Sequence, residues 1–217
     1  MVESRSGYGV IIFSIILVVF MILFVPWVTV VSGKTIGYVV SNLVYWFVFC
    51  VPMIAFYAKG SWSNIKVLYS KNCGDTRAIL YNAAAFLPVL ATGFLVFIPT
   101  IREAPVMVVV FAFIYAVVNG TIEELFWRGI YNKLFTKIGM AYIVPTILFS
   151  LWHIALALAK GMVYHGGALA LLGGAAFMGV LWGIIAYNTK SIRYTTIAHI
   201  LTNFFAFSGL IYENWFV

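Results

Sequence analysis

The sequence has little charge. Only 9% of its 217 residues are charged, whereas 64% are hydrophobic. A soluble domain typically has about 25% charged residues, and one of this size could not bury so much apolar surface in its core. The composition therefore excludes a soluble globular protein and predicts an integral membrane protein surrounded by lipid.

Cysteine is also scarce, and the basic residues are dispersed. Cys50 lies in an apolar segment and Cys73 in a polar connection, so we expect no disulfide between them. The net charge of +7 comes from residues spread over short connections, which form no continuous basic face. We therefore predict no nucleic-acid partner.

Long apolar runs occupy most of the chain, and a helix needs about 20 residues to cross the hydrocarbon core. The runs of that length cover residues 10–31, 36–58, 78–101, 105–127, 143–159, 168–188 and 195–212. We predict an all-α polytopic bundle of seven transmembrane helices, with eight as the alternative count. The first run is too long for a signal-peptide core, so we expect it to remain as an anchor.

Lysine and arginine are divided unequally between the two sets of connections. One set contains Arg5, Lys59, Lys66, Lys71, Arg77, Arg128, Lys133, Lys137, Lys190 and Arg193. The other contains Lys34, Arg102 and Lys160. Because cytoplasmic connections keep the excess of basic residues, this division predicts a cytoplasmic amino terminus and a carboxyl terminus outside. Over residues 129–142, basic and apolar side chains mix as in a helix lying in the membrane interface.

Ionisable side chains inside a membrane are costly and indicate function. Those that fall within or at the end of the apolar runs are Glu123, Glu124, His153 and His199. Glu124 precedes Arg128 by four residues, the favourable order for a helical ion pair, while Glu123 points about 100° away. We predict that Glu124 is a structural partner of Arg128, and that Glu123, with Asn119 one turn earlier, can act as a general base.

Two further polar groups complete a set suited to hydrolysis. His199 and Asn203 share one helix face, where an imidazole and an amide could bind an oxyanion. With Glu123 and His153 they supply the base, the oxyanion donors and the acid that peptide hydrolysis needs. Asp75 is the only aspartate, which excludes a two-aspartate mechanism, and no HExxH or GxSxG motif occurs.

Three motifs stand in order along the chain. EExxxR is Glu123 to Arg128, FxxxH is Phe149 to His153, and HxxxN is His199 to Asn203. Over residues 105–207 the chain resembles the CPBP family, the CaaX prenyl protease and bacteriocin-processing group of intramembrane proteases. Gly179 and Gly183, spaced for close helix packing, are similar to that family's glycine-containing helix. We therefore divide the chain into amino-terminal helices, residues 1–104, and a four-helix catalytic core within residues 105–217.

The resemblance implies an intramembrane endopeptidase that cuts a membrane-associated protein or peptide, such as a prenylated CaaX-type tail or a bacteriocin leader. It implies water activation by Glu123 and His153, and oxyanion binding by His199 and Asn203. The supporting residues are Glu124, Arg128, Phe149 and Asn119. We expect glutamate-type general-base catalysis without a cofactor, in a cavity facing the cytoplasm. A zinc ion held by Glu123, His153 and His199 is the alternative.

Two other classes of protein also keep buried glutamate and histidine. An ion- or proton-coupled transporter lines its pathway with such residues, and a non-catalytic scaffold or immunity protein could bind a peptide in the same cavity. Ion flux without proteolysis would identify the first class. Function that survives the loss of Glu123 would identify the second. The sequence defines neither the substrate nor the oligomeric state.

Overall fold

The computed structural model describes residues 5–70 and 76–217, and these two ranges contain helices and connections but no strand. Cys50 is buried and free. Lys71, Cys73 and Asp75, which entered the sequence predictions, lie outside the described residues.

Within the described ranges, seven helical stretches are long and apolar enough to cross a membrane. They cover Gly7–Ser32, Lys34–Ala58, Thr76–Ile101, Val106–Leu134, Gly139–Ala157, Gly167–Thr189 and Arg193–Phe216. Each predicted apolar run overlaps one of these stretches, which confirms the all-α polytopic bundle. We refer to them as the first to seventh spans.

Most spans consist of more than one helical element, because short π-helical turns (η) interrupt the α-helices. In chain order the elements are α1 (Arg5–Ser32), α2 (Lys34–Leu43), η1 (Val44–Cys50), α3 (Val51–Ala58), α4 (Trp62–Leu68), α5 (Thr76–Ala84), α6 (Leu87–Thr92), η2 (Gly93–Phe97), α7 (Ile98–Ile101), α8 (Val106–Glu123), η3 (Glu124–Ile130), α9 (Tyr131–Leu134), η4 (Gly139–Ile143), α10 (Val144–Ala157), α11 (Gly167–Thr189), α12 (Arg193–Ile211) and η5 (Tyr212–Phe216). The turn η3 begins at Glu124, within the EExxxR motif. Such turns are frequent at functional sites.

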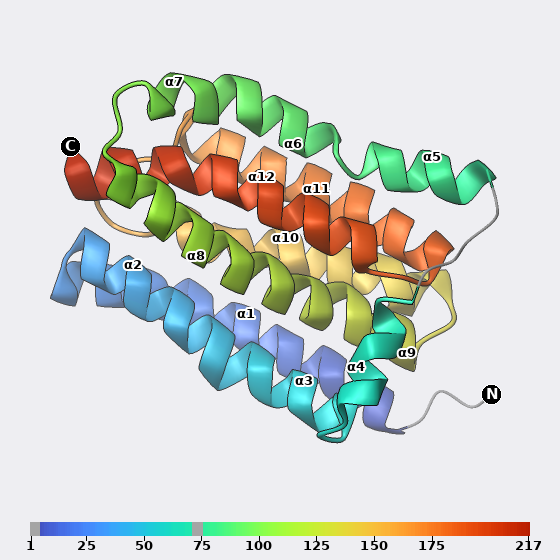
Figure 1. The fold of residues 1–217 in the computed structure, drawn as a ribbon. Helices are drawn as coiled ribbons and strands as arrows, with labels where there is room; N and C mark the ends of the chain where they lie inside the picture. Colours follow the sequence, from blue (N-terminus) through green and yellow to red (C-terminus); the bar gives the residue numbers. More distant parts are fainter. Residues whose placement is uncertain (1–4, 71–75) are drawn as a thin grey trace.

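The fourth and seventh spans form the centre of the bundle, where α8 and α12 pack along each other (Figure 1). Behind them, α10 packs against both α11 and α1. The elements α1 to α3 lie on one flank and α5 to α7 on the other, and α12 ends far from the end where α1 begins (Figure 1).

Two glycines bring α11 close to α10. A Cβ added at Gly183 would lie 2.8 Å from Oγ1 of Thr146 and 2.9 Å from ring atoms of Tyr142. At Gly179 it would lie 3.1 Å from the ring of Phe149. The predicted role of this glycine pair in close helix packing is therefore confirmed, and the packing holds the FxxxH helix in place.

The interfacial helix predicted over residues 129–142 is wrong. The fourth span continues as a helix to Leu134, and the next span begins at Gly139. Phe135 is only 2% exposed, and its ring lies 2.9 Å from where a Cβ of Gly7 would be. The Phe135 side chain of this segment therefore packs against α1, whereas Ile138 is exposed.

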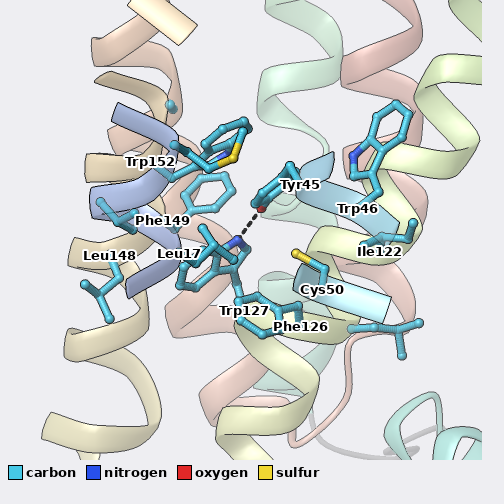
Figure 2. Packing of buried hydrophobic residues seen from close by; sticks show 14 of the residues in the cluster. Leu17, Tyr45, Trp46, Cys50, Ile122, Phe126, Trp127, Leu148, Phe149 and Trp152 are labelled. Atoms are coloured by element: carbon cyan, nitrogen blue, oxygen red, sulfur yellow. Dashed lines mark hydrogen bonds between the residues drawn. The ribbon is translucent and has the colours of Figure 1, made fainter. Parts of the chain in front are cut away.

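The core beside the central spans is rich in aromatic residues that also have a polar atom (Figure 2). The rings of Tyr45 and Trp152 stack with centroids 3.9 Å apart. The indole Nε1 of Trp127 donates a 2.7 Å hydrogen bond to the Tyr45 hydroxyl (Figure 2). These contacts join the second, fourth and fifth spans, and Tyr45 and Trp152 both donate hydrogen bonds to Glu123.

Candidate active site

Glu123, at the end of α8, is 1% exposed and accepts contacts from three other spans and its own. Its Oε1 accepts hydrogen bonds from the Tyr45 hydroxyl at 2.9 Å and from Nε1 of Trp152 at 3.0 Å. Its Oε2 accepts one from Nδ2 of Asn119 at 3.0 Å and lies 3.3 Å from Nε2 of His199. A carboxylate has about four acceptor positions, so this one is fully surrounded. The contacts stabilise a charge that lipid alone could not.

Two of these donors are held by further side chains. Trp127 donates to the Tyr45 hydroxyl, and Nε1 of Trp46 donates to Oδ1 of Asn119 at 2.8 Å. Tyr45 and Trp46 belong to η1 in the second span. The position of Glu123 therefore depends on the amino-terminal half of the chain as well as on the region that contains the motifs.

His199 bridges the two adjacent glutamates. Its Nε2 faces Glu123, and its Nδ1 lies 3.1 Å from Oε1 of Glu124. An imidazole donates from both nitrogens only when it is protonated, so two carboxylates around one ring favour an imidazolium. Together with Arg128, the cluster then contains two negative and two positive charges.

Glu124 forms the predicted ion pair, because Nη1 of Arg128 lies 3.0 Å from its Oε1. The additional contact of Glu124 with His199 was not predicted. The guanidinium of Arg128 lies over the ring of Phe149, 4.1 Å from its centroid. Phe149 of the FxxxH motif therefore supports Arg128 of the EExxxR motif.

His153 presents one ring nitrogen to the interior. Its Nδ1 is 2.8 Å from the carbonyl oxygen of Phe149. A carbonyl only accepts hydrogen bonds, so Nδ1 has the hydrogen, and in the neutral ring Nε2 is the acceptor. The side chain is 8% exposed and lines a cavity. His153 thus has the tautomer that a general base requires.

Asn203 and Thr202 have buried polar atoms with no partner among the described residues, namely the amide Nδ2 and the hydroxyl Oγ1. Asn203 is 7% exposed, and both residues line the same cavity as His153. Buried polar groups nearly always have a hydrogen-bond partner. The unpartnered amide is therefore suited to a bound molecule.

The cavity has a volume of about 490 Å³. Its polar end is lined by Asn119, Glu123, His153, His199, Thr202 and Asn203. The rest of the wall is mainly apolar and comes from α2, α6, η2, α10, α11 and α12. The predicted site residues Glu123, His153, His199 and Asn203 therefore converge on one space, whereas Glu124, Arg128 and Phe149 lie behind it.

The wall extends from Glu123 toward the end where α2 and α11 begin and α10 ends. Residues Tyr164, His165 and Gly166, between α10 and α11, form part of it. This end has the Lys34 and Lys160 connections, opposite the strongly basic ones. If the amino terminus is cytoplasmic, this end of the bundle lies outside. The predicted cytoplasmic amino terminus and the predicted cytoplasm-facing cavity therefore cannot both hold in this fold.

The rim of the cavity is fixed by the turn that follows α12. The Val163 amide donates to Oδ1 of Asn214, and Nδ2 of Asn214 donates to the Val163 carbonyl, both at 2.8 Å. The Tyr164 hydroxyl donates to the carbonyl of Leu156, and burial raises the pKa of this hydroxyl. The rim is thus ordered and uncharged at Tyr164 near neutral pH.

The donor set does not fit a zinc ion in this arrangement. Over residues 5–70 and 76–217, no three His, Cys, Asp or Glu side chains are grouped as metal ligands. Both nitrogens of His199 face carboxylates, and Glu123 already accepts four contacts. The metal-free mechanism stays a prediction.

Residues 105–205 match a family model described as Rce1-like, type II CAAX prenyl endopeptidase Rce1-like. Over this region, which is a little under half of the chain, the protein is similar to the Rce1-like family. The match confirms the family predicted from the three motifs, and it includes Glu123, His153, His199 and Asn203. No curated protein and no solved structure matches the chain.

Sequence reasoning missed Tyr45, Trp46 and Trp152, three of the side chains that hold the site. Tyr45 and Trp46 lie outside the Rce1-like region, and Trp152 lies inside it, next to the motif histidine. The feature of the sequence that could have identified them is the presence of polar aromatic side chains in the middle of apolar runs. Because Tyr and Trp also fill apolar cores, that signal alone does not distinguish support of a site from packing.

Proposed function

We propose that this chain is an intramembrane endopeptidase that hydrolyses a peptide bond in a membrane-associated protein or peptide. The observation that best supports the proposal is that Glu123, His153 and Asn203, from three spans, line one cavity. The description of the matched family, a CAAX prenyl endopeptidase, agrees with it. A prenylated tail and a bacteriocin leader are both substrates of the proposed kind.

In this mechanism, water binds between Nε2 of His153 and the Glu123 carboxylate. At 3.3 Å, the contact of His199 with Glu123 is the longest of the four at that carboxylate, so it is the one that water displaces. The displacement frees an acceptor on Glu123. The Glu123 carboxylate then takes one proton of the water, and Nε2 of His153 accepts a hydrogen bond from the other, as the water oxygen bonds to the carbonyl carbon.

The resulting oxyanion needs donors in a site shielded from water. Nδ2 of Asn203 is one, and Nε2 of His199, once released from Glu123, is the other. Donors placed where charge develops lower the barrier, and removal of one typically costs about 10²–10³ in kcat. The carbon–nitrogen bond then breaks, and the amine leaves with the proton that the base had accepted.

The test compares cells that express the wild type, Glu123→Gln, His153→Ala or the control Glu103→Gln, which changes an exposed glutamate. All four proteins must be present in the membrane at equal amounts. The proposal predicts that the same polypeptide accumulates uncut with the first two variants and not with the control. It is overturned if either variant cleaves that polypeptide at the wild-type rate. Chelators should leave the wild-type rate unchanged.

A further inference from the structure

The cavity has a second opening, through its side wall, between the third and sixth spans. Ala91 of α6 and Leu95 of η2 line the cavity and are also exposed, Leu95 by 67%. Across from them, Ala170 of α11 lines the cavity and is exposed, and Gly174 is half-buried. These positions lie inside the two spans. Side chains exposed at that depth face lipid, so the cavity reaches the bilayer.

Contacts elsewhere in the fold hold the third and sixth spans in place while they stay separated at this opening. Near the other end of the two spans, Nε1 of Trp182 donates a 2.9 Å hydrogen bond to the carbonyl of Ala85. Ala85, Trp182, Ile185 and Ala198 form a buried cluster there. Beyond it, α6 and η2 pack against α12. A Cβ added at Gly174 would meet no atom within 4 Å.

The space inside leads to unpartnered polar groups. Nδ2 of Asn203 and Oγ1 of Thr202 are buried in the cavity wall without a partner in the described part of the chain. An extended peptide could supply a carbonyl oxygen to the amide, whereas the hydrocarbon chain of a lipid could not. The apolar wall and the polar end together therefore favour a peptide.

Hydrogen bonding indicates the conformation of that peptide. Inside an α-helix the backbone carbonyls already accept hydrogen bonds from amides one turn later. The carbonyls of an extended chain are free to accept one from Nδ2 of Asn203. The unpartnered amide therefore favours an extended chain over an intact transmembrane helix.

We propose that an extended apolar segment of a membrane-anchored polypeptide enters sideways from the bilayer, between α6–η2 and α11, and passes over Gly174 to reach Asn203 and His153. This inference rests on the proposed function and adds the route and the conformation of the substrate.

The test uses the full chain with Glu123→Gln, so that a bound peptide is not cut, in phosphatidylcholine vesicles. The probe is a leucine-rich peptide that contains a photoreactive leucine, and mass spectrometry locates its crosslinks. Gly174→Phe narrows the opening. Gly173→Phe is the matched control, since Gly173 is the neighbouring residue on α11, is exposed, has open space for a Cβ and does not line the cavity.

We expect crosslinks near Leu95 and Gly174 in the parent protein and in Gly173→Phe, and about tenfold fewer in Gly174→Phe, because a bulky ring in a fitted site is costly. If Gly174→Phe does not fold, Ala91→Phe narrows the opening from the opposite wall. Equal crosslinking in the blocked and control variants overturns the inference. So do crosslinks confined to Tyr164–Gly166, which would mean entry from the aqueous end.

A photoreactive phosphatidylcholine that labels these positions while the peptide does not also overturns the inference, because the occupant is then a lipid. The readout is binding, so it is separate from proteolysis. A protein that binds the peptide through the opening but never cleaves a polypeptide supports the inference and counts against the proposed function.

Discussion

Tyr45 connects the Glu123 carboxylate to Trp127, because its hydroxyl donates to one and accepts from the other. In Tyr45→Phe, Glu123 loses one of four donors and the buried Trp127 N–H loses its acceptor. An unsatisfied buried group costs about 1–3 kcal/mol. We expect the free energy of unfolding to fall by that amount and kcat to fall about tenfold, measured by thermal unfolding in detergent and by cleavage kinetics.

The control for this prediction is Tyr187→Phe. The Tyr187 hydroxyl donates to the carbonyl of Thr136 at an exposed position, so both quantities should stay near wild type. Wild-type stability and rate in Tyr45→Phe would mean that the hydrogen bonds of Tyr45 do not support Glu123.

Asn203 offers a sharper separation of function from stability. Asn203→Leu removes a buried amide nitrogen that has no partner among the described residues, so the folded protein should be as stable as wild type or more stable. If that amide binds the oxyanion, kcat should fall by about 10²–10³ with KM little changed.

Asn188→Leu is the control for this substitution, because Asn188 is exposed and donates to the Ile184 carbonyl within its own helix. A large loss of stability in Asn203→Leu, or an unchanged kcat, would contradict the assigned role of Asn203.

The residues of the motifs were predictable because ionisable groups at membrane depth are rare. The contacts that these residues make were harder to predict. Helical spacing gave the ion pair of Glu124 with Arg128, but it could not show that His199, seventy-five residues away, contacts both glutamates. That contact depends on how α12 packs against α8, which the sequence pattern does not define.

The helix α11 depends on missing side chains where it packs against the fifth span. In Gly183→Val, the new Cβ would lie 2.8 Å from Thr146 and 2.9 Å from Tyr142, both on the adjoining span. We expect the free energy of unfolding to fall by about 1–3 kcal/mol, as in other overpacked contacts. Thermal unfolding of the purified protein measures this change.

Gly173→Val is the matched control, since a Cβ there meets nothing within 4 Å. Both variants lose the same backbone freedom of glycine, so their difference isolates the helix contact. Equal melting temperatures would show that α10 and α11 can separate at little cost.

The spans themselves were predictable to within a few residues, because hydropathy over about 20 residues is a strong signal. The segment after the fourth span was not. Lys133 and Lys137 beside apolar residues suggested a helix at the interface, but Phe135 is buried against α1. A local pattern cannot distinguish a lipid-facing apolar side chain from one covered by another helix.

At the scale of the whole molecule, the distribution of basic residues predicts the orientation. Arg128 is one of the ten basic residues in the larger set of connections. It is 3% exposed and paired with Glu124, so it gives no information on topology. The remaining nine against three still predict a cytoplasmic amino terminus. The cavity would then open toward the outside.

This orientation can be measured by labelling single cysteines in a Cys50→Ser, Cys73→Ser background with an impermeant maleimide. His165→Cys, at the cavity rim, should react in intact cells, and Lys133→Cys should react only after permeabilisation. Both side chains are accessible, since His165 is 48% exposed and the Lys133 amine forms an exposed hydrogen bond. The reverse pattern would mean that the cavity faces the cytoplasm.

The seventh span contributes His199 and Asn203, and its final turn, η5, fixes the rim through Asn214. The ribosome makes this span after the other six. A nascent chain with six inserted helices would therefore have Glu123 and His153 but neither the bridging imidazole nor the amide. Any hydrolytic activity would have to wait for insertion of the seventh span, so partly synthesised molecules would be harmless to neighbouring polypeptides during biogenesis.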